Sequence, residues 1–181
     1  MFITIAGDLG SGKSTVGKLL AKHLDYSFMS IGDLMGELAI ERGVTLLELS
    51  RYAEKYNEID SILDEKVMVL GKEKDNIILD SRLGWHFIPN SIKIYLKVEL
   101  EEGARRIVND PRKDEPENTD IETTKANLLT RRDSEIQRYS DYYGIKELDN
   151  PNNYDLVINT THITPEEVLD FIMRHIGDEE V

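Results

Sequence analysis

The segment from Gly7 to Ser14, GDLGSGKS, constrains this chain more than any other feature. It fits the pattern G-x-x-x-x-G-K-[ST] of a phosphate-binding P-loop. An apolar run, 2–6, precedes it, and a helical pattern from Ser14 to Leu24 follows it. In that setting the glycines let the backbone bend, so that successive N–H groups and a helix N-terminus point at phosphate oxygens. The sequence therefore predicts a strand, a tight loop and a helix that bind a nucleoside triphosphate.

The P-loop pattern gives a role to several side chains of this segment. Lys13 is expected to reach the terminal phosphates, and the hydroxyl of Ser14 is expected to bind Mg²⁺. Ser11 and Thr15 would add hydrogen-bond donors nearby. The residues predicted to bind the nucleotide are Gly7, Asp8, Leu9, Gly10, Ser11, Gly12, Lys13, Ser14 and Thr15.

Asp8 does not fit this chemistry easily, because a carboxylate beside a polyphosphate is repelled. We expect its side chain either to face away from the phosphates or to meet the metal ion through water.

Strand patterns alternate with helical patterns along the 181 residues, a length typical of one domain. This alternation indicates a mostly parallel sheet with helices on both faces. We predict a three-layer α/β fold with five strands. Besides 2–6, strands are expected at 27–30, 76–80, 92–98 and 154–159. Helices are expected at 14–24, 33–42, from 45, at 59–70, 99–108 and 121–143, and from 164.

Two segments interrupt the alternation. Residues 33–74 form a helical insert, and residues 109–120 carry two prolines and seven charges without apolar periodicity. The second segment is expected to be a mobile loop.

The composition excludes several classes of protein. A net charge of −13 disfavours nucleic acid polymers and anionic membranes as partners. No apolar run approaches the roughly 20 residues of a membrane span, and the N-terminus lacks a signal-peptide pattern, so a cytoplasmic location is expected. The chain has no cysteine, which excludes disulfides and thiolate metal sites. Its four histidines do not cluster at metal-ligand spacing.

Other P-loop classes lack support in the sequence. The base-reading motif and switch of GTPases are absent in suitable context, and so is the signature of ABC-type ATPases. A kinase for a small molecule fits better, because such an enzyme needs a second anion site and a lid that excludes water.

The residues after the third predicted strand are candidates for that second site. Asp80 ends the strand and Arg82 follows it, at the edge of the sheet where ligands bind. Arg82 is placed to grip a phosphate, or else forms a surface ion pair. Asp80 would hold Mg²⁺ through water, or else caps the strand. Trp85 is expected in the core or as a ligand platform.

On these motifs the chain resembles the nucleoside monophosphate kinases, and most closely the small archaeal-type cytidylate kinases and their bacterial relatives. The matching segments occur in family order over nearly the whole chain: GDLGSGKS, SIGDL, LDSRLGWHFIPNSIKIYL, RRDSEIQRYSDYYGI and YDLVINTT. The resemblance implies that Lys13 and Ser14 serve ATP and Mg²⁺. It also implies that residues 33–74 bind the acceptor and that 109–120 is the lid.

The resemblance further assigns acceptor residues. Ser30, Gly32 and Asp33 would begin the wall of the acceptor site, and Arg82 would hold the acceptor phosphate. A further set matches the family pattern R-x-x-x-D-x-x-R on one helix face: Arg131, Glu135 and Arg138. Without the other motifs, this set would be taken for ion pairs on a solvated helix.

The sequence departs from the family at Gly36, where an arginine usually helps to grip the acceptor phosphate. Arg42 or Arg51 is a possible substitute. An arginine introduced at Gly36 would restore the contact, provided that the backbone accepts a side chain. The presence of Glu135 instead of aspartate is a milder change.

We therefore expect a monomer that phosphorylates a nucleoside monophosphate, CMP or dCMP, with ATP and Mg²⁺. Lys13, Arg82, Arg131 and Arg138 would carry catalysis by positioning and charge stabilisation. Two alternatives stay open at this point: a kinase for another small acceptor, and an ATP-binding regulatory protein with little turnover.

Overall fold

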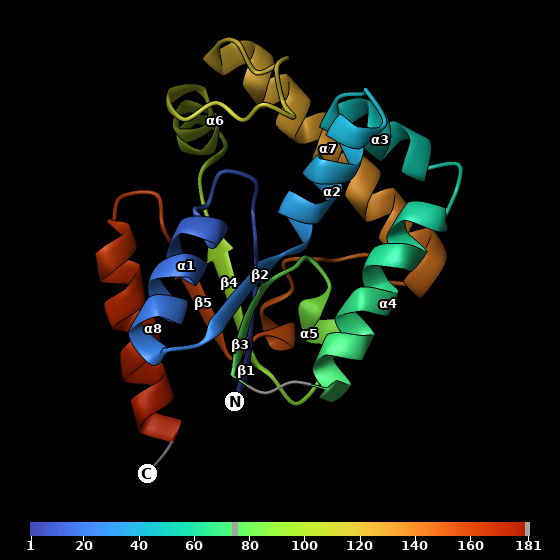
Figure 1. Cartoon of the computed structure of the whole chain (residues 1–181). Coiled ribbons are helices and arrows are strands. Elements are labelled where there is room, and N and C mark those ends of the chain that lie inside the picture. The colour runs from blue at the N-terminus through green and yellow to red at the C-terminus, as the bar shows by residue number, and fades with distance from the viewer. Residues whose placement is uncertain (74–75, 180–181) are drawn as a thin grey trace.

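Five parallel strands form the centre of the computed structural model, which describes residues 1–73 and 76–179 (Figure 1). Their order across the sheet is β2-β3-β1-β4-β5. All six residues of the central strand are buried, which explains its unbroken apolar run. The predicted α/β class is confirmed. The strands are β1 (Phe2–Gly7), β2 (Ser27–Ser30), β3 (Ile77–Asp80), β4 (Ile92–Lys97) and β5 (Leu156–Asn159).

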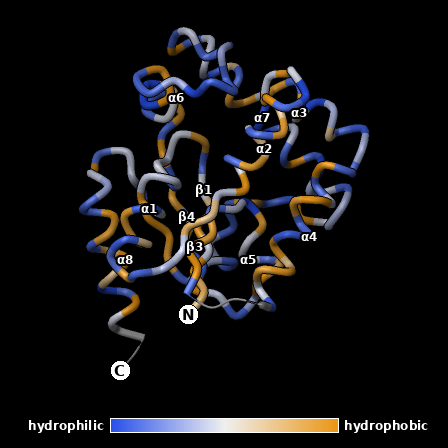
Figure 2. Tube along the Cα trace, viewed as in Figure 1, coloured by the Kyte–Doolittle hydropathy of each residue, from blue (hydrophilic) through white to orange (hydrophobic). Residues whose placement is uncertain are grey.

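Helices cover both faces of the sheet, which gives the three predicted layers. On one face lie α1 (Lys13–Leu24) and α8 (Pro165–Glu179), where Ile3, Ile5 and Leu20 join one apolar cluster. On the other face lie α4 (Glu58–Glu73) and α5 (Gly84–Phe87), beside a cluster that contains Phe2 and Leu79. Figure 2 shows the apolar residues concentrated along the strands and the helix sides that face them. Among the described residues no helix is both long and apolar enough to cross a bilayer.

Four helices gather beyond the carboxyl ends of the strands, above the sheet in Figure 1. They are α2 (Ile31–Glu41), α3 (Leu46–Ala53), α6 (Leu100–Asn109) and α7 (Ile121–Tyr143). The predicted insert corresponds to α2, α3 and α4, except that Lys74 lies outside the described residues. Because ligands bind at this edge of parallel sheets, these helices enclose the site.

Several predicted helix ends are confirmed by their caps. Thr45 and Glu48 form a capping box at the start of α3, and Gly144, with φ of 71°, ends α7. The start of the second helix was predicted too late. It begins at Ile31 instead of Asp33, because the Ser30 hydroxyl caps it by accepting a hydrogen bond from the Asp33 amide at 3.2 Å. The short helices α5 and η1 (Pro151–Asn153) carry no periodicity that could predict them.

The segment 110–120 has no helix or strand, as predicted, yet it is not simply solvated. Asp114, Glu115 and Asn118 are buried. The Leu46 amide donates to the Asp114 carbonyl at 2.9 Å, which ties the segment to the start of α3. Its closing motion as a lid stays a prediction.

A close backbone contact fixes the P-loop. A Cβ on Gly10 would lie 2.5 Å from the Gly103 carbonyl oxygen, and a Cβ on Gly103 would lie 2.8 Å from the Leu9 carbonyl oxygen. Gly10 also has φ of 78°, in the left-handed region. Helix α6 therefore packs directly on the loop, with glycine required on both sides.

This contact predicts the effect of Gly103→Ala. Alanine favours a helix by about 1 kcal/mol over glycine, but here its methyl group meets the Leu9 carbonyl. We expect a net loss of about 1–3 kcal/mol in the free energy of unfolding, together with weaker ATP binding. Urea unfolding measures the first and calorimetry the second. Gly177→Ala, in α8 with open space around it, should instead gain up to about 1 kcal/mol. An equal gain in the free energy of unfolding for both variants would contradict a close contact between Gly103 and the phosphate loop.

Candidate functional site: a P-loop cavity

The loop between β1 and α1 presents unpaired donors to a ligand. Gly12, with φ of 87°, precedes α1, and no side chain caps this helix end. The first amides of the helix are therefore available to phosphate oxygens. The Ser11 hydroxyl is buried and has no hydrogen-bond partner among the described residues. The Lys13 ammonium donates to the Asp8 carbonyl at 2.6 Å, which holds it over the loop.

Lys13 is poised electrostatically. Burial, followed by the nearby Arg82 guanidinium, lowers its pKa to about 7, while Asp80 and Glu135 act in the opposite direction. A bound polyphosphate would favour the charged ammonium, because an opposite charge nearby stabilises that form. The site is thus prepared for anionic phosphates.

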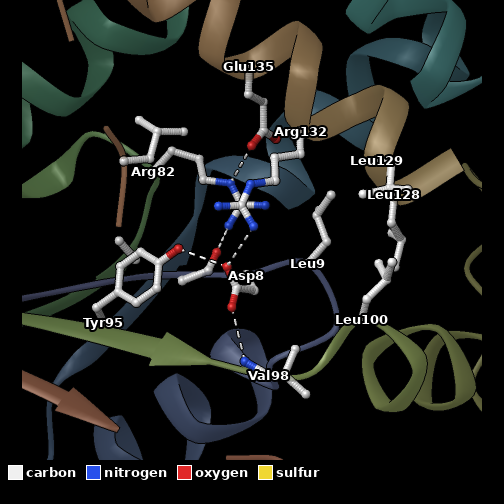
Figure 3. A pocket seen from close by; sticks show the side chains of 13 residues that line it. Asp8, Leu9, Arg82, Tyr95, Val98, Leu100, Leu128, Leu129, Arg132 and Glu135 are labelled. Carbon is white, nitrogen blue, oxygen red and sulfur yellow. Dashed lines mark hydrogen bonds and ion pairs between the residues drawn. The ribbon is translucent and has the colours of Figure 1, made fainter. Parts of the chain in front are cut away.

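Asp8 turns its carboxylate away from the phosphate loop. One oxygen accepts from the Tyr95 hydroxyl at 2.9 Å, and the other accepts from the Val98 amide at 3.0 Å (Figure 3). Arg132 lies 3.9 Å from the same carboxylate. Asp8 therefore joins β4 to the loop, which corresponds to the first of the two expected orientations.

Behind the loop, Asp8 also lines a small side cavity of about 130 Å³, the one drawn in Figure 3. Leucines from several elements supply most of its apolar wall: Leu9, Leu100, Leu128, Leu129 and Leu148. The paired Arg82 and Glu135 line both this side cavity and the main cavity described below.

The expected metal ligands are brought together. The Ser14 hydroxyl donates to Asp80 at 2.6 Å, and the Ser30 hydroxyl donates to the same carboxylate oxygen at 3.3 Å. A hydroxyl and a carboxylate are hard oxygen ligands of the kind that Mg²⁺ binds together with substrate phosphates and water. The described residues hold no group of three or more histidine, cysteine or carboxylate side chains that could bind a metal ion on their own.

Arg82 connects three parts of the site. Its Nε donates to Glu135 on α7 at 2.9 Å, and its Nη1 donates to the Gly7 carbonyl at the end of β1. Burial opposes the ionisation of Glu135, but Arg82 and the arginines of α7 hold its pKa below the usual value. The guanidinium is thereby fixed between the P-loop and α7.

The two arginines predicted on α7 also pair with buried acids. Arg131 donates to Glu115 at 2.9 Å, and Arg138, only 2% exposed, donates to both oxygens of Asp60 at 2.6 and 2.7 Å. Arg131, Glu135 and Arg138 face one cavity, so they are not ion pairs on a solvated helix.

This main cavity, of about 250 Å³, contains most of the predicted site residues. Leu9 lines both cavities, whereas Gly7 and Asp8 line only the side cavity. Asp33 is not part of the lining but pairs with Arg112, which is, at 3.1 Å. The predicted residues that the main cavity brings together are Gly10, Gly12, Lys13, Ser14, Thr15, Ser30, Gly32, Asp80, Arg82, Arg131, Glu135 and Arg138.

Gly36 is packed against the segment 110–120. A Cβ there would lie 2.3 Å from a carboxylate oxygen of Asp114 and 3.2 Å from Arg112. The condition attached to an arginine at Gly36, that a side chain is accepted there, is therefore not met unless the buried Asp114 carboxylate is displaced. Arg42 and Arg51, the suggested substitutes, are exposed and line neither cavity. Arg112 reaches the cavity instead.

Some residues of the site were not predicted from the sequence. Asp60 and Asp64 line the cavity from α4, and Tyr139 does so from α7. The spacing of Asp60 and Asp64, at i and i+4 beside the apolar stripe of α4, could have indicated two carboxylates on one helix face. Arg106 donates to the Thr160 carbonyl at 2.6 Å and so joins α6 to the turn after β5; its sequence context gave no such signal.

The burial of Lys13 predicts a cost to stability. In the fold its pKa is about 7, whereas a free lysine has 10.5, so the buried charge destabilises the protein fully below pH 7. Lys13→Met should raise the free energy of unfolding by on the order of 2 kcal/mol at pH 6, and the gain should shrink as pH rises from 7 toward 10. Denaturant titrations at several pH values measure this. Lys22→Met, at an exposed lysine of the same helix, is the control. A less stable Lys13→Met at pH 6 would contradict the prediction.

Known proteins resemble this chain over nearly its whole length. The cytidylate kinase of Haloarcula marismortui is 41% identical over 187 aligned positions, which cover 99% of this chain and 94% of that protein. The S-adenosylmethionine-dependent nucleotide dehydratase of Lacinutrix mariniflava is 38% identical over 174 positions, which cover 96% of this chain but 35% of that protein.

Solved structures and the family model complete the comparison. The shikimate kinase of Bacteroides thetaiotaomicron superposes with a TM-score of 0.67 over 98% of both chains at 12% identity, a likeness of fold alone. The model of the cytidylate kinase-like family matches residues 2–162. The chain belongs to the cytidylate kinase-like family.

Proposed function

We propose that this protein transfers the γ-phosphoryl group of ATP to CMP or dCMP. Its family makes it a nucleoside monophosphate kinase, and the named relatives suggest the pyrimidine acceptor. One observation carries the proposal: a single cavity joins the phosphate loop at Lys13 to Arg82, which follows β3, and to the arginines of α7. Such a cavity can hold a donor and an acceptor phosphate at once.

The donor end is formed by the loop and the start of α1. The free amides after Gly12 would bind the β- and γ-phosphates, and Lys13 would follow the phosphoryl group as charge develops. Ser14 and Asp80 would hold Mg²⁺, which neutralises phosphate charge when bound.

The acceptor end is formed by Arg82, Arg131 and Arg112. Arg82 and Arg131 are kept in place by Glu135 and Glu115, so their planar donors are positioned before a phosphate arrives. Arg112 belongs to the segment 110–120, and it would bring the proposed lid onto the acceptor.

The chemical step needs no protein nucleophile. An oxygen of the acceptor phosphate forms a bond to the γ-phosphorus, and the bond from that phosphorus to the bridging oxygen breaks, with its electron pair leaving on ADP. The acceptor phosphate is already ionised at neutral pH, so no general base is required. Catalysis is positioning and charge stabilisation by Lys13 and the arginines.

A second candidate function is that of a kinase for a different small acceptor. The likeness to shikimate kinase suggests it, but that likeness extends to the fold alone. A panel of acceptors separates the candidates: CMP, dCMP, UMP, AMP, GMP and shikimate, with ATP and Mg²⁺. Coupled ADP release measures turnover, and chromatography identifies the product. We expect CDP or dCDP to form fastest. Fastest turnover with shikimate or a purine monophosphate, or ADP release that depends on none of these acceptors, would contradict the proposal.

Arg82→Lys tests the placement of the two ends. Lysine cannot form two parallel hydrogen bonds to a phosphate, so acceptor binding should weaken while ATP binding changes little. We expect the KM for the monophosphate to rise roughly 10- to 150-fold, which corresponds to about 1.5–3 kcal/mol. Arg105→Lys, at a half-exposed arginine of α6, is the control. If only the KM for ATP rises in Arg82→Lys, the assignment of the two ends is reversed.

A further inference from the structure

The main cavity ends, on the side of α4, in carboxylates. Asp60 and Asp64 line it from the first half of this helix, one turn apart. Figure 1 shows α4 on the other side of the sheet from α1, the helix that follows the phosphate loop. The cavity is therefore lined by Lys13 from the side of α1, here called its cationic end, and by the two carboxylates from the side of α4, here called its acidic end.

The acidic end is built with defined partners. Arg138 donates to both oxygens of Asp60, and the Tyr143 hydroxyl donates to one oxygen of Asp64. The other oxygen of Asp64 has no hydrogen-bond partner among the residues that the structure describes. A carboxylate that faces a cavity with a free oxygen accepts a hydrogen bond from a ligand.

The walls at this end suit a flat ring. Leu63 and Tyr139 line the cavity next to the carboxylates, and the Arg138 guanidinium lies 5.4 Å from the centre of the Tyr139 ring. Aliphatic and aromatic side chains of this kind pack against the faces of a nucleobase. The edge of that base would then meet the acidic residues.

We infer that Asp64 recognises the base of the acceptor and selects a 4-amino pyrimidine over a 4-keto pyrimidine. Asp64 lies beside the Asp60–Arg138 pair, and the inference rests on the proposed function. The carboxylate accepts from the exocyclic amine of cytosine, the pairing by which acidic side chains recognise this base elsewhere. The 4-keto oxygen of uracil is itself an acceptor, so it faces the carboxylate without a proton between them. Asp64 is thereby a specificity residue, outside the phosphate-transfer machinery.

Protonation of Asp64 would weaken this selection. Burial raises its pKa to about 6; Asp60 acts in the same direction, while Tyr143 and Arg138 act against it. A protonated carboxyl can donate to the 4-keto oxygen. The preference for CMP over UMP should then fall between pH 7.5 and pH 5.5. The second ionisation of the phosphate is common to both ligands and cancels in their ratio.

Calorimetric binding of CMP and UMP, without ATP, tests the inference independently of turnover. The parent should prefer CMP. Asp64→Asn should reduce the ratio of the dissociation constant for UMP to that for CMP roughly 10- to 100-fold. That ratio should depend on pH in the parent and not in Asp64→Asn. Glu65→Gln, at the exposed neighbouring carboxylate, should retain the preference.

The outcomes separate the inference from the proposed function. A parent without preference for CMP, or a ratio unchanged by Asp64→Asn and by pH, overturns the inference. If Asp64→Asn fails to fold, the parent still tests the inference, because a ratio that does not change between pH 7.5 and pH 5.5 contradicts it. Selective CMP binding without phosphoryl transfer would leave the inference standing and overturn the proposed function. Phosphoryl transfer to CMP, with a ratio of dissociation constants that neither Asp64→Asn nor pH changes, would support the proposed function and overturn the inference.

Discussion

The Arg82 guanidinium is the contact on which the site depends most. It is largely shielded from solvent between the Gly7 carbonyl, where the phosphate loop begins, and the Glu135 carboxylate of α7. A buried cation needs a paired anion, since an isolated charge away from water is very costly. The pair fixes three elements that are far apart in sequence: the end of β1, the end of β3 and the middle of α7.

The same requirement explains the composition of the cavity. Its lining holds five basic side chains, Lys13, Arg82, Arg112, Arg131 and Arg138, and five acidic ones, Asp60, Asp64, Asp80, Glu115 and Glu135. The acids keep the cations ionised and oriented before a phosphate is bound. Lys13 is the exception, because its contact is a backbone carbonyl, and its lowered pKa reflects that weaker compensation. Part of the stability of the fold is thus given up for a site that is ready for anions.

The fold could be predicted because its signals are local. The run before Gly7 is buried on both faces and reads as a central parallel strand, and the caps at Thr45 and Gly144 end helices by backbone rules that hold anywhere. The phosphate loop was likewise visible, because its function needs consecutive residues. Ser14, Asp80 and Arg82 follow strands or loops whose position in a parallel sheet is known in advance.

The rest of the site depends on contacts between distant segments. Asp60 meets Arg138 across 78 positions, and no spacing rule links them. Gly36 suggested a missing arginine, but the close approach of Asp114 from the segment 110–120 gives the glycine its reason. Such contacts depend on how the helices above the sheet pack against each other. They could not be predicted from a single sequence.

The central claim is that one cavity binds a monophosphate between a cationic and an acidic end. A crystal structure with a bisubstrate ligand, in which adenosine and cytidine are joined through a polyphosphate chain, tests it most directly. The account predicts the adenosine-side phosphates on the amides after Gly12, the chain passing Arg82, and the cytosine amine at Asp64. Cytosine bound in the side cavity beside Asp8, or exposed to solvent with Asp64 uncontacted, would contradict it.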